Sequence, residues 1–320
     1  KDLERISFSA NENITIGKYS LQLEFNSTIT NDLKGFYKSQ FLDLNDNVKW
    51  IATTQFEPTS ARNAFPCWDE PEYKAVFSIA LTSDEKYLRI SNEKVLSENK
   101  LKDGRVETLF VDSMKMSTYL VAFVIGELEV TEVGSVGDTK IRIIHRPGFS
   151  HQTSFAGIAG MKILEFFENY YQIPYPGSKL DLIAIPDFAM GAMENVGAVT
   201  FRESLLLIDE SKATRQELSR SVSVIAHELA HMWFGDLVTM KWWDGIWLNE
   251  AFASLMESIA ANGTYPEFEQ WSEMNLSRSA GFGVDSLKNS RPVEFEVETP
   301  EQAEEMFDVL TYEKGSTVLR

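Results

Sequence analysis

Two histidines one helical turn apart are the residues in this chain whose spacing predicts chemistry most directly. They occur in His227-Glu-Leu-Ala-His231, inside a segment that apolar periodicity predicts to be a helix over residues 215–234. Residues four apart lie on one face of a helix, so both imidazoles can approach one metal ion. Glu228 projects about 100° round the helix from His227, which is where a base that deprotonates a metal-bound water must stand.

A catalytic zinc takes three protein ligands and keeps a fourth position open. We expect the third ligand to be Glu250, which lies on the next predicted helix, residues 246–262, with 18 residues between it and His231. A bare HExxH string also occurs by chance on charged helices, and the following glutamate argues against that interpretation. The other two histidines, His145 and His151, are expected to be ordinary residues near a domain boundary. The prediction is one Zn²⁺ per chain.

Three separated motifs carry a resemblance to a known family. The chain resembles the M1 (gluzincin) zinc aminopeptidases, and among them the puromycin-sensitive and bacterial aminopeptidase N branches. The resemblance extends from about residue 15 to the end of the chain. Its motifs are Gly191-Ala-Met-Glu-Asn195, then HELAH with Glu250, then Thr311-Tyr-Glu-Lys-Gly315; supporting strings are Gln55-Phe-Glu-Pro58, Ala64-Phe-Pro-Cys-Trp-Asp-Glu-Pro71 and Trp233-Phe-Gly-Asp-Leu-Val-Thr239.

The resemblance implies how a substrate is held by its amino end. Family members bind the free α-ammonium group with carboxylates, which here would be Glu194 and Glu57. Two buried acids beside a metal are costly unless a cation neutralises them, and a substrate amine would do so. Gly191 and Ala192 would pair with the peptide as an added strand.

The same resemblance implies a first side-chain pocket and an oxyanion donor. Met190, Met193 and Gln55 are similar to positions that line this pocket, and methionine can adapt to varied side chains. Tyr312 would hydrogen-bond the oxyanion as the scissile carbonyl becomes tetrahedral. The plain alternative for these residues is core packing or, for Glu194, the capping of a turn.

The predicted function is a metallo-aminopeptidase (EC 3.4.11.-) that acts on peptides with a free N-terminus. One alternative is a thermolysin-like endopeptidase, but an endopeptidase has no substrate amine for Glu194 and Glu57 to neutralise. The other is a non-catalytic scaffold on an M1 fold. Such relatives typically lose ligands or the base, whereas the residues for both are present here.

The elements that must position these residues fall into two parts. Residues 1–148 read as short strands, which predicts an incomplete, antiparallel, sandwich-like β domain. Residues 149–320 alternate helices and strands, and we expect an incomplete, thermolysin-like mixed α/β peptidase domain, so the fold class is α+β and multidomain. The expected strands are 19–25, 75–81, 106–111, 139–144, 180–185 and 198–208; the expected helices are 155–171, 215–234, 246–262 and 315–320.

Charge and composition narrow the classes of partner. Residues 1–150 carry 18 Lys and Arg against 22 Asp and Glu, whereas residues 151–320 carry 12 against 26, so the second half holds −14 of the net −18. This negative electrostatic field disfavours the binding of nucleic acid and attracts cations.

No apolar run is long enough to span a bilayer. The one cysteine, Cys67, favours a cytoplasmic location. We expect a fragment of a longer protein; no pattern indicates an oligomeric state.

Overall fold

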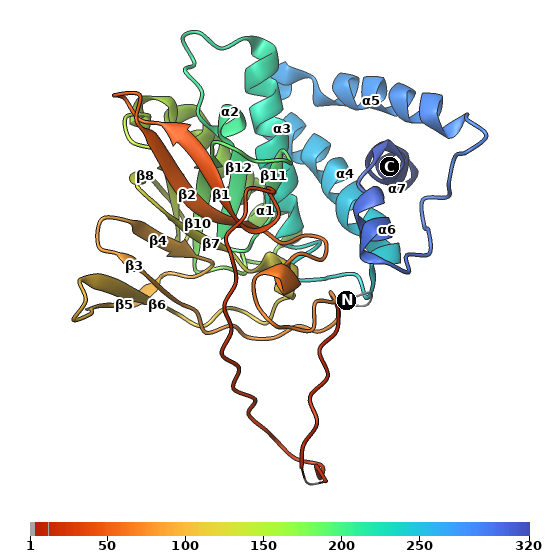
Figure 1. The fold of residues 1–320 in the computed structure, drawn as a ribbon. Helices are drawn as coiled ribbons and strands as arrows, with labels where there is room; N and C mark the ends of the chain where they lie inside the picture. Colours follow the sequence, from red (N-terminus) through yellow and green to blue (C-terminus); the bar gives the residue numbers. More distant parts are fainter. Residues whose placement is uncertain (1–3, 12) are drawn as a thin grey trace.

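The computed structural model describes residues 4–11 and 13–320 (Figure 1). Two antiparallel sheets come first along the chain, with strand orders β1-β2-β7-β4 and β3-β6-β5. Alternate residues of β1 are buried, as period-two patterning requires of a half-buried strand. The strands are β1 (Gly35–Leu42), β2 (Val48–Gln55), β3 (Ala80–Asp84), β4 (Leu88–Ser91), β5 (Val95–Lys100), β6 (Arg105–Phe110) and β7 (Phe123–Gly126).

A mixed five-stranded sheet follows, with strand order β11-β12-β10-β9-β8. Its central strand, β10, runs parallel to both neighbours, and every residue of β10 is buried, as expected for a strand covered on both faces. The two-residue strand β11 lies at the sheet edge, antiparallel to β12. The strands are β8 (Glu129–Val136), β9 (Thr139–His145), β10 (Lys179–Ile185), β11 (Ala192–Met193) and β12 (Ala198–Arg202).

Helices dominate the second half of the chain. Thr214 caps the start of helix α3 and forms a reciprocal capping box with Glu217. The helices are α1 (Ser154–Tyr171), α2 (Glu203–Leu206), α3 (Arg215–His231), α4 (Ile246–Thr264), α5 (Gln270–Asp285), α6 (Pro300–Glu305) and α7 (Gly315–Leu319); shorter turns are η1 (Ala61–Asn63), η2 (Thr118–Leu120), η3 (Ser150–Gln152), η4 (Trp243–Gly245), η5 (Pro266–Phe268) and the π-helical η6 (Leu310–Lys314).

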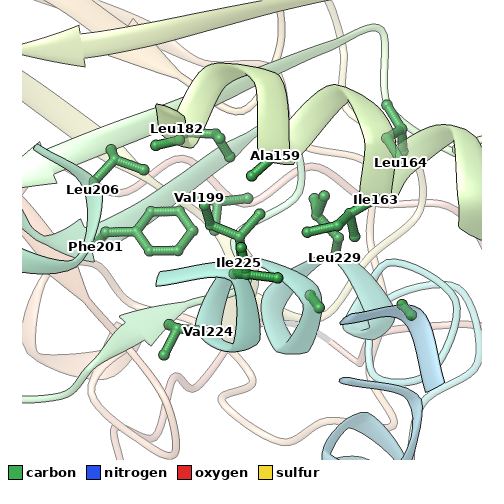
Figure 2. Packing of buried hydrophobic residues seen from close by; sticks show 14 of the residues in the cluster. Ala159, Ile163, Leu164, Leu182, Val199, Phe201, Leu206, Val224, Ile225 and Leu229 are labelled. Atoms are coloured by element: carbon green, nitrogen blue, oxygen red, sulfur yellow. The ribbon is translucent and has the colours of Figure 1, made fainter. Parts of the chain in front are cut away.

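The largest core fixes α3 against the mixed sheet. Ile225 and Leu229 of α3 are fully buried, and they pack with α1 and with Val199 of β12 (Figure 2). Fully burying a side chain of this size stabilises the fold by about 1.5–3 kcal/mol. The apolar face of α3 is therefore held by the sheet, which leaves its other face to line a cleft.

The expected fold class is confirmed: antiparallel sheets form the first part, and helices with a mixed sheet form the second. Strands β8 and β9 precede residue 148 but belong to the mixed sheet, so that sheet draws on both sides of the predicted boundary; the division into 1–148 and 149–320 stays a prediction. Among the described residues, no helix combines the length and the apolar character that crossing a membrane requires.

The predicted strand over residues 19–25 is wrong. These residues form part of an extended segment that loops away from the remainder of the molecule (Figure 1), and they pair with no other strand among the described residues. Tyr19 and Leu21 are 63% and 62% exposed. Alternation of apolar residues makes a strand only where a neighbouring strand accepts its hydrogen bonds and a packed layer covers its apolar face.

The predicted strand over residues 75–81 is largely wrong, because only its last two residues lie in β3. Ala75 forms an isolated antiparallel bridge with Met116, and the Phe77 backbone amide donates to the Ser113 hydroxyl rather than to a carbonyl. The segment is extended, but side-chain hydrogen bonds replace part of the ladder.

Three element ends also differ from expectation. The strand predicted over 198–208 stops at Arg202, whose backbone amide donates to Gly191 O, and α2 follows. Helix α4 continues through Asn262-Gly263 to Thr264 and stops before Pro266, which cannot continue it. Helix α3 ends at His231, and residues 232–234 continue as tighter turns. The last predicted helix, 315–320, is found as α7.

Candidate metal centre and peptide cleft

Two imidazoles and one carboxylate converge between α3 and α4. His227 Nε2 lies 3.1 Å from Glu250 Oε2, and His231 Nε2 lies 3.4 Å from the same oxygen. One ligand atom from each of the three residues lies within 4.8 Å of the other two. The helical spacing inferred from the sequence brings the histidine rings to a centroid separation of 4.7 Å. The structure thus brings together the three residues predicted as metal ligands.

The second nitrogen of each imidazole has its own partner. His227 Nδ1 lies 3.2 Å from Glu257 Oε2, and His231 Nδ1 lies 2.9 Å from Asn249 Oδ1 and 3.1 Å from the Phe234 carbonyl oxygen. Acceptors at Nδ1 hold the proton there, so that Nε2 of both rings can bind a metal. Glu257 and Asn249 were missed by the sequence analysis. Both lie on α4 with Glu250, and the seven-residue interval from Glu250 to Glu257 returns to the same helix face.

The donor set fits zinc. Two imidazole nitrogens and one carboxylate oxygen are ligands that zinc accepts, and three protein ligands leave a position open. The electrostatics of the three residues also favour a bound metal cation. Burial lowers the pKa of His227, but its hydrogen bonds with Glu250 and Glu257 outweigh burial and raise that pKa to about 9. The cluster therefore attracts positive charge, which a divalent ion supplies.

A second acidic group lies beside the triad. Glu57 and Glu194 are 8% and 2% exposed, and together with Glu250 they present carboxylate oxygens within 4.8 Å of one another. Glu194 Oε1 accepts a hydrogen bond from Asn249 Nδ2 at 3.4 Å, whereas Glu57 Oε1 has no partner in the described part of the chain. Burial raises the pKa of both carboxyls, and Glu194 adds to the shift at Glu57. The nearest basic group is His231, whose Nδ1 lies 3.9 Å from Glu194 Oε1 and whose charge partly opposes the rise in both pKa values.

The remaining predicted contacts come from β2 and from the edge strand β11. Gln55 Nε2 at the end of β2 lies 3.3 Å from Met193 Sδ. Gly191 accepts a backbone hydrogen bond from Arg202, which holds the start of β11 against the end of β12. Ala192 lies in β11 and Met190 just before it, 42% exposed. Among the described residues β11 has no neighbouring strand on its outer side, and such an edge can pair with an extended peptide.

Glu228 and Tyr312 line the cleft together with the two histidines. Burial raises the pKa of Glu228 to about 8, and the charges of His227 and His231 oppose that rise. The Tyr312 ring stacks on His227 at a centroid distance of 5.9 Å. Burial and the nearby Glu250 raise the pKa of the Tyr312 phenol well above its usual range, so the hydroxyl keeps its proton and can donate it in a hydrogen bond.

All the residues predicted for catalysis, metal binding and substrate binding line one cleft of about 1150 Å³. The two remaining histidines lie outside it. His145 is buried with Nε2 2.9 Å from Thr131 Oγ1, and His151 stacks on Phe149. The cleft continues past the metal ligands between α3 and α5, where its lining is rich in serine and glutamate.

The chain matches two family descriptions. "Peptidase family M1 domain" matches residues 155–320, and "Peptidase M1 N-terminal domain" matches residues 1–120. The first match contains the whole metal triad, Glu194 and Tyr312, and the second contains Gln55 and Glu57.

Similar proteins carry aminopeptidase names. The chain is 43% identical to puromycin-sensitive aminopeptidase of Caenorhabditis elegans over 95% of its length, which is 32% of that protein. It is 43% identical to endoplasmic reticulum aminopeptidase 2 of Homo sapiens over 100% of its length, 34% of that protein, and 42% identical to aminopeptidase M1-A of Oryza sativa over 97%, 35% of that protein. The chain thus spans about a third of the length of these relatives. Its motifs, its paired family matches and these relatives agree that this chain belongs to peptidase family M1.

Proposed function

We propose that this protein is a zinc aminopeptidase, which removes the first residue from peptides with a free N-terminus. The observation that carries the proposal is that a three-ligand metal site and a buried pair of carboxylates lie side by side in one cleft. His231 Nδ1 lies 3.9 Å from Glu194 Oε1, so the metal ligands and the acidic pair are adjacent. A metal site alone supports hydrolysis; the acidic pair beside it supports hydrolysis at a peptide's amino end.

His227, His231 and Glu250 are the residues that would hold the zinc. Zinc bound there would supply a Lewis acid that polarises the scissile carbonyl and activates water. Glu228 takes the proton from the attacking water and delivers it to the departing amine. Tyr312 donates a hydrogen bond to the carbonyl oxygen as negative charge develops on it. Asn249 and Glu257 orient the two histidines.

Glu57 and Glu194 explain why cleavage is restricted to the first residue. A protonated α-amine compensates two buried carboxylates that otherwise repel each other and Glu250. Once the amine is fixed there, the first peptide carbonyl is the one that reaches the metal site. The Gly191–Met193 backbone pairs with the peptide, and Met190, Met193 and Gln55 contact its first side chain.

The two rival functions are less well supported. A thermolysin-like endopeptidase gains nothing from Glu57 and Glu194, because an internal peptide bond brings no ammonium group to them. A non-catalytic scaffold needs neither a base at Glu228 nor a protonated phenol at Tyr312 in the cleft. For the compartment, the free Cys67 supports our expectation of the cytoplasm.

Zinc content and hydrolysis of aminoacyl fluorogenic amides test the proposal together. We expect one zinc per chain and release of the fluorophore from amides with a free α-amine. The matched control is the same panel with the α-amine acetylated, which should be cleaved at least about tenfold more slowly because an acetylated amine has no charge. Equal rates on both panels would favour the endopeptidase, and zinc-loaded protein without hydrolysis of either would favour the scaffold.

A further inference from the structure

The turn that follows Glu194 connects two strands of unequal strength. Strand β11 pairs with β12 over two residues only, and the last pair before the turn is Met193 with Thr200. Glu194 is therefore the first residue of the connection, residues 194–199. The hydrogen bond from Asn249 to the Glu194 carboxylate is long, at 3.4 Å. The position of that carboxylate thus depends mainly on how the backbone of the turn is held.

A buried lysine at the start of β10 holds this turn. The ammonium group of Lys179, which is 5% exposed, donates to the Gly197 carbonyl at 2.5 Å and to the Ser91 carbonyl at 3.0 Å. Its third donor pairs with Asp181 Oδ2 at 2.8 Å, so all three N–H groups of the ammonium are used. The Gly197 amide donates to the Tyr175 hydroxyl at 3.0 Å. Side chains thus bind both the carbonyl and the amide of Gly197.

The turn also fits closely against Asn92, which follows β4. Gly197 has a φ of +73°, and a Cβ on it would lie 2.0 Å from the Asn92 carbonyl oxygen, so the position requires glycine. Asn92 Nδ2 donates to the Val196 carbonyl at 2.9 Å, and Asn92 Oδ1 accepts from the Ala122 amide at 2.9 Å. Two successive carbonyls of the turn are therefore held, one by Asn92 and the next by Lys179.

The same edge of one sheet carries the other acid of the pair. Strands β2 and β4 both run antiparallel to β7, so they are parallel to each other, and Ile51 and Leu88 both lie opposite Gly126. Glu57 follows the end of β2 by two residues, and Asn92 directly follows the end of β4. This edge therefore presents Glu57 to the cleft and holds the turn that begins at Glu194.

We propose that Lys179 is a positioning residue for the amine site: it holds the turn of Glu194 against the sheet edge that carries Glu57, and so fixes the separation of the two carboxylates. This inference rests on the proposed aminopeptidase function. An ammonium group held by two carboxylates needs both within hydrogen-bonding distance at once. A buried ion pair adds little stability compared with apolar side chains of the same volume, so we assign to Lys179 the geometry that its three bonds enforce.

Binding of trialanine and N-acetyltrialanine to the zinc-loaded Glu228→Gln protein tests the proposal. Calorimetry gives the ratio of the two affinities, which measures the preference for a free amine. Adding Lys179→Met should reduce this ratio about tenfold, because a shift of about 1 Å in one carboxylate weakens its bond to the amine. Lys179→Arg should restore part of the ratio, since it keeps the charge and the donors. The matched control is Arg142→Met: Arg142 also pairs with Asp181, at 2.7 Å, but among the described residues it has no hydrogen bond to residues 195–197. It should also lower the unfolding temperature, yet keep the ratio.

A milder variant keeps the test decisive if Lys179→Met does not fold. Tyr175→Phe keeps the ring and removes only the hydroxyl that accepts from the Gly197 amide, so it should reduce the ratio in the same direction by a smaller factor. An undiminished ratio in folded Lys179→Met, or in Tyr175→Phe where Lys179→Met does not fold, would overturn the inference. An equal reduction in Arg142→Met would also overturn it, because the effect would then be general destabilisation. Equal binding of the two peptides by the Glu228→Gln protein itself would contradict the proposed function instead.

Discussion

Glu250 and Glu57 are both buried carboxylates of the same cleft, but their neighbours differ. Glu250 lies against two imidazoles, and although burial raises the pKa of its carboxyl, His231 and His227 outweigh burial and hold that pKa well below its usual range. Glu57 lies against other carboxylates, and burial together with Glu194 holds its pKa well above its usual range. The same desolvation therefore gives opposite outcomes, decided by the charge of the nearest side chains.

This difference indicates what each group binds. Glu250 and its histidines form a mixed nitrogen and oxygen set whose outer nitrogens are already oriented, as a zinc site requires. Glu57 and Glu194 offer oxygen atoms alone, and Glu57 Oε1 is left without a partner among the described residues. That group suits an ammonium ion, which brings its own hydrogen-bond donors. Substitutions of residues in this cleft test whether one group binds zinc and the other binds an ammonium ion.

Glu228→Gln should have the largest effect on catalysis. Glutamine preserves the shape of the side chain but cannot accept the proton, so kcat should fall by about 10³- to 10⁴-fold. Zinc content should stay at one per chain, because Glu228 is not among the three converging ligands. Steady-state kinetics and metal analysis of the same preparation check both parts. Substantial turnover by the zinc-loaded variant would remove Glu228 from its role as base.

Tyr312→Phe should have the next largest effect, a loss in kcat of about 10²- to 10³-fold. Phenylalanine keeps the stacking on His227 but removes the hydroxyl that we propose as the donor to the oxyanion. KM should change little, since the hydrogen bond strengthens only as charge develops. A variant that raises KM and leaves kcat intact would place Tyr312 in ground-state binding instead.

Glu194→Gln tests whether Glu194 binds the α-amine of the peptide. Of the three substitutions, it should have the smallest effect. The affinity for an uncleaved peptide analogue with a free amine should fall by about 10- to 100-fold, because one charged hydrogen bond is lost. The acetylated analogue should bind as it does to the wild type. Glu273→Gln removes one charge from the cleft lining on α5 and serves as the matched control. Equal losses for both analogues would contradict the assignment of Glu194 to the amine.

Much of the site could be predicted from the sequence because its chemistry is local. The positions of His227 and His231 follow from helical spacing, and Glu250 follows from the need for a third ligand on the next helix. Glu57 was predicted to be a site residue only because of the family resemblance. Glu57 lies just after β2, far in sequence from α3, and its partnerless oxygen and raised pKa depend on a three-dimensional arrangement that no local pattern reveals.

The errors in secondary structure have a common physical cause. Residues 19–25 alternate like a strand, but a strand forms only with a partner, and partners are non-local. Residues 203–208 were predicted to extend the strand that begins at Ala198, yet residues 203–206 turn into α2, where Glu203 pairs with Arg146 at 2.9 Å. Periodicity was sufficient for α1 and α3 because a helix makes its hydrogen bonds within its own segment.

Zinc stoichiometry in two single variants tests the central assignment most directly. The carboxylate of Glu250 belongs to both possible ligand sets, one with His227 and His231 and one with Glu57 and Glu194, so substitutions of His227 and Glu194 distinguish the two positions for the ion. With zinc between the histidines and Glu250, His227→Ala should lose most of the bound metal, and Glu194→Gln should keep one zinc per chain. Retention of zinc by His227→Ala together with its loss from Glu194→Gln would place the ion in the all-carboxylate group and contradict the account.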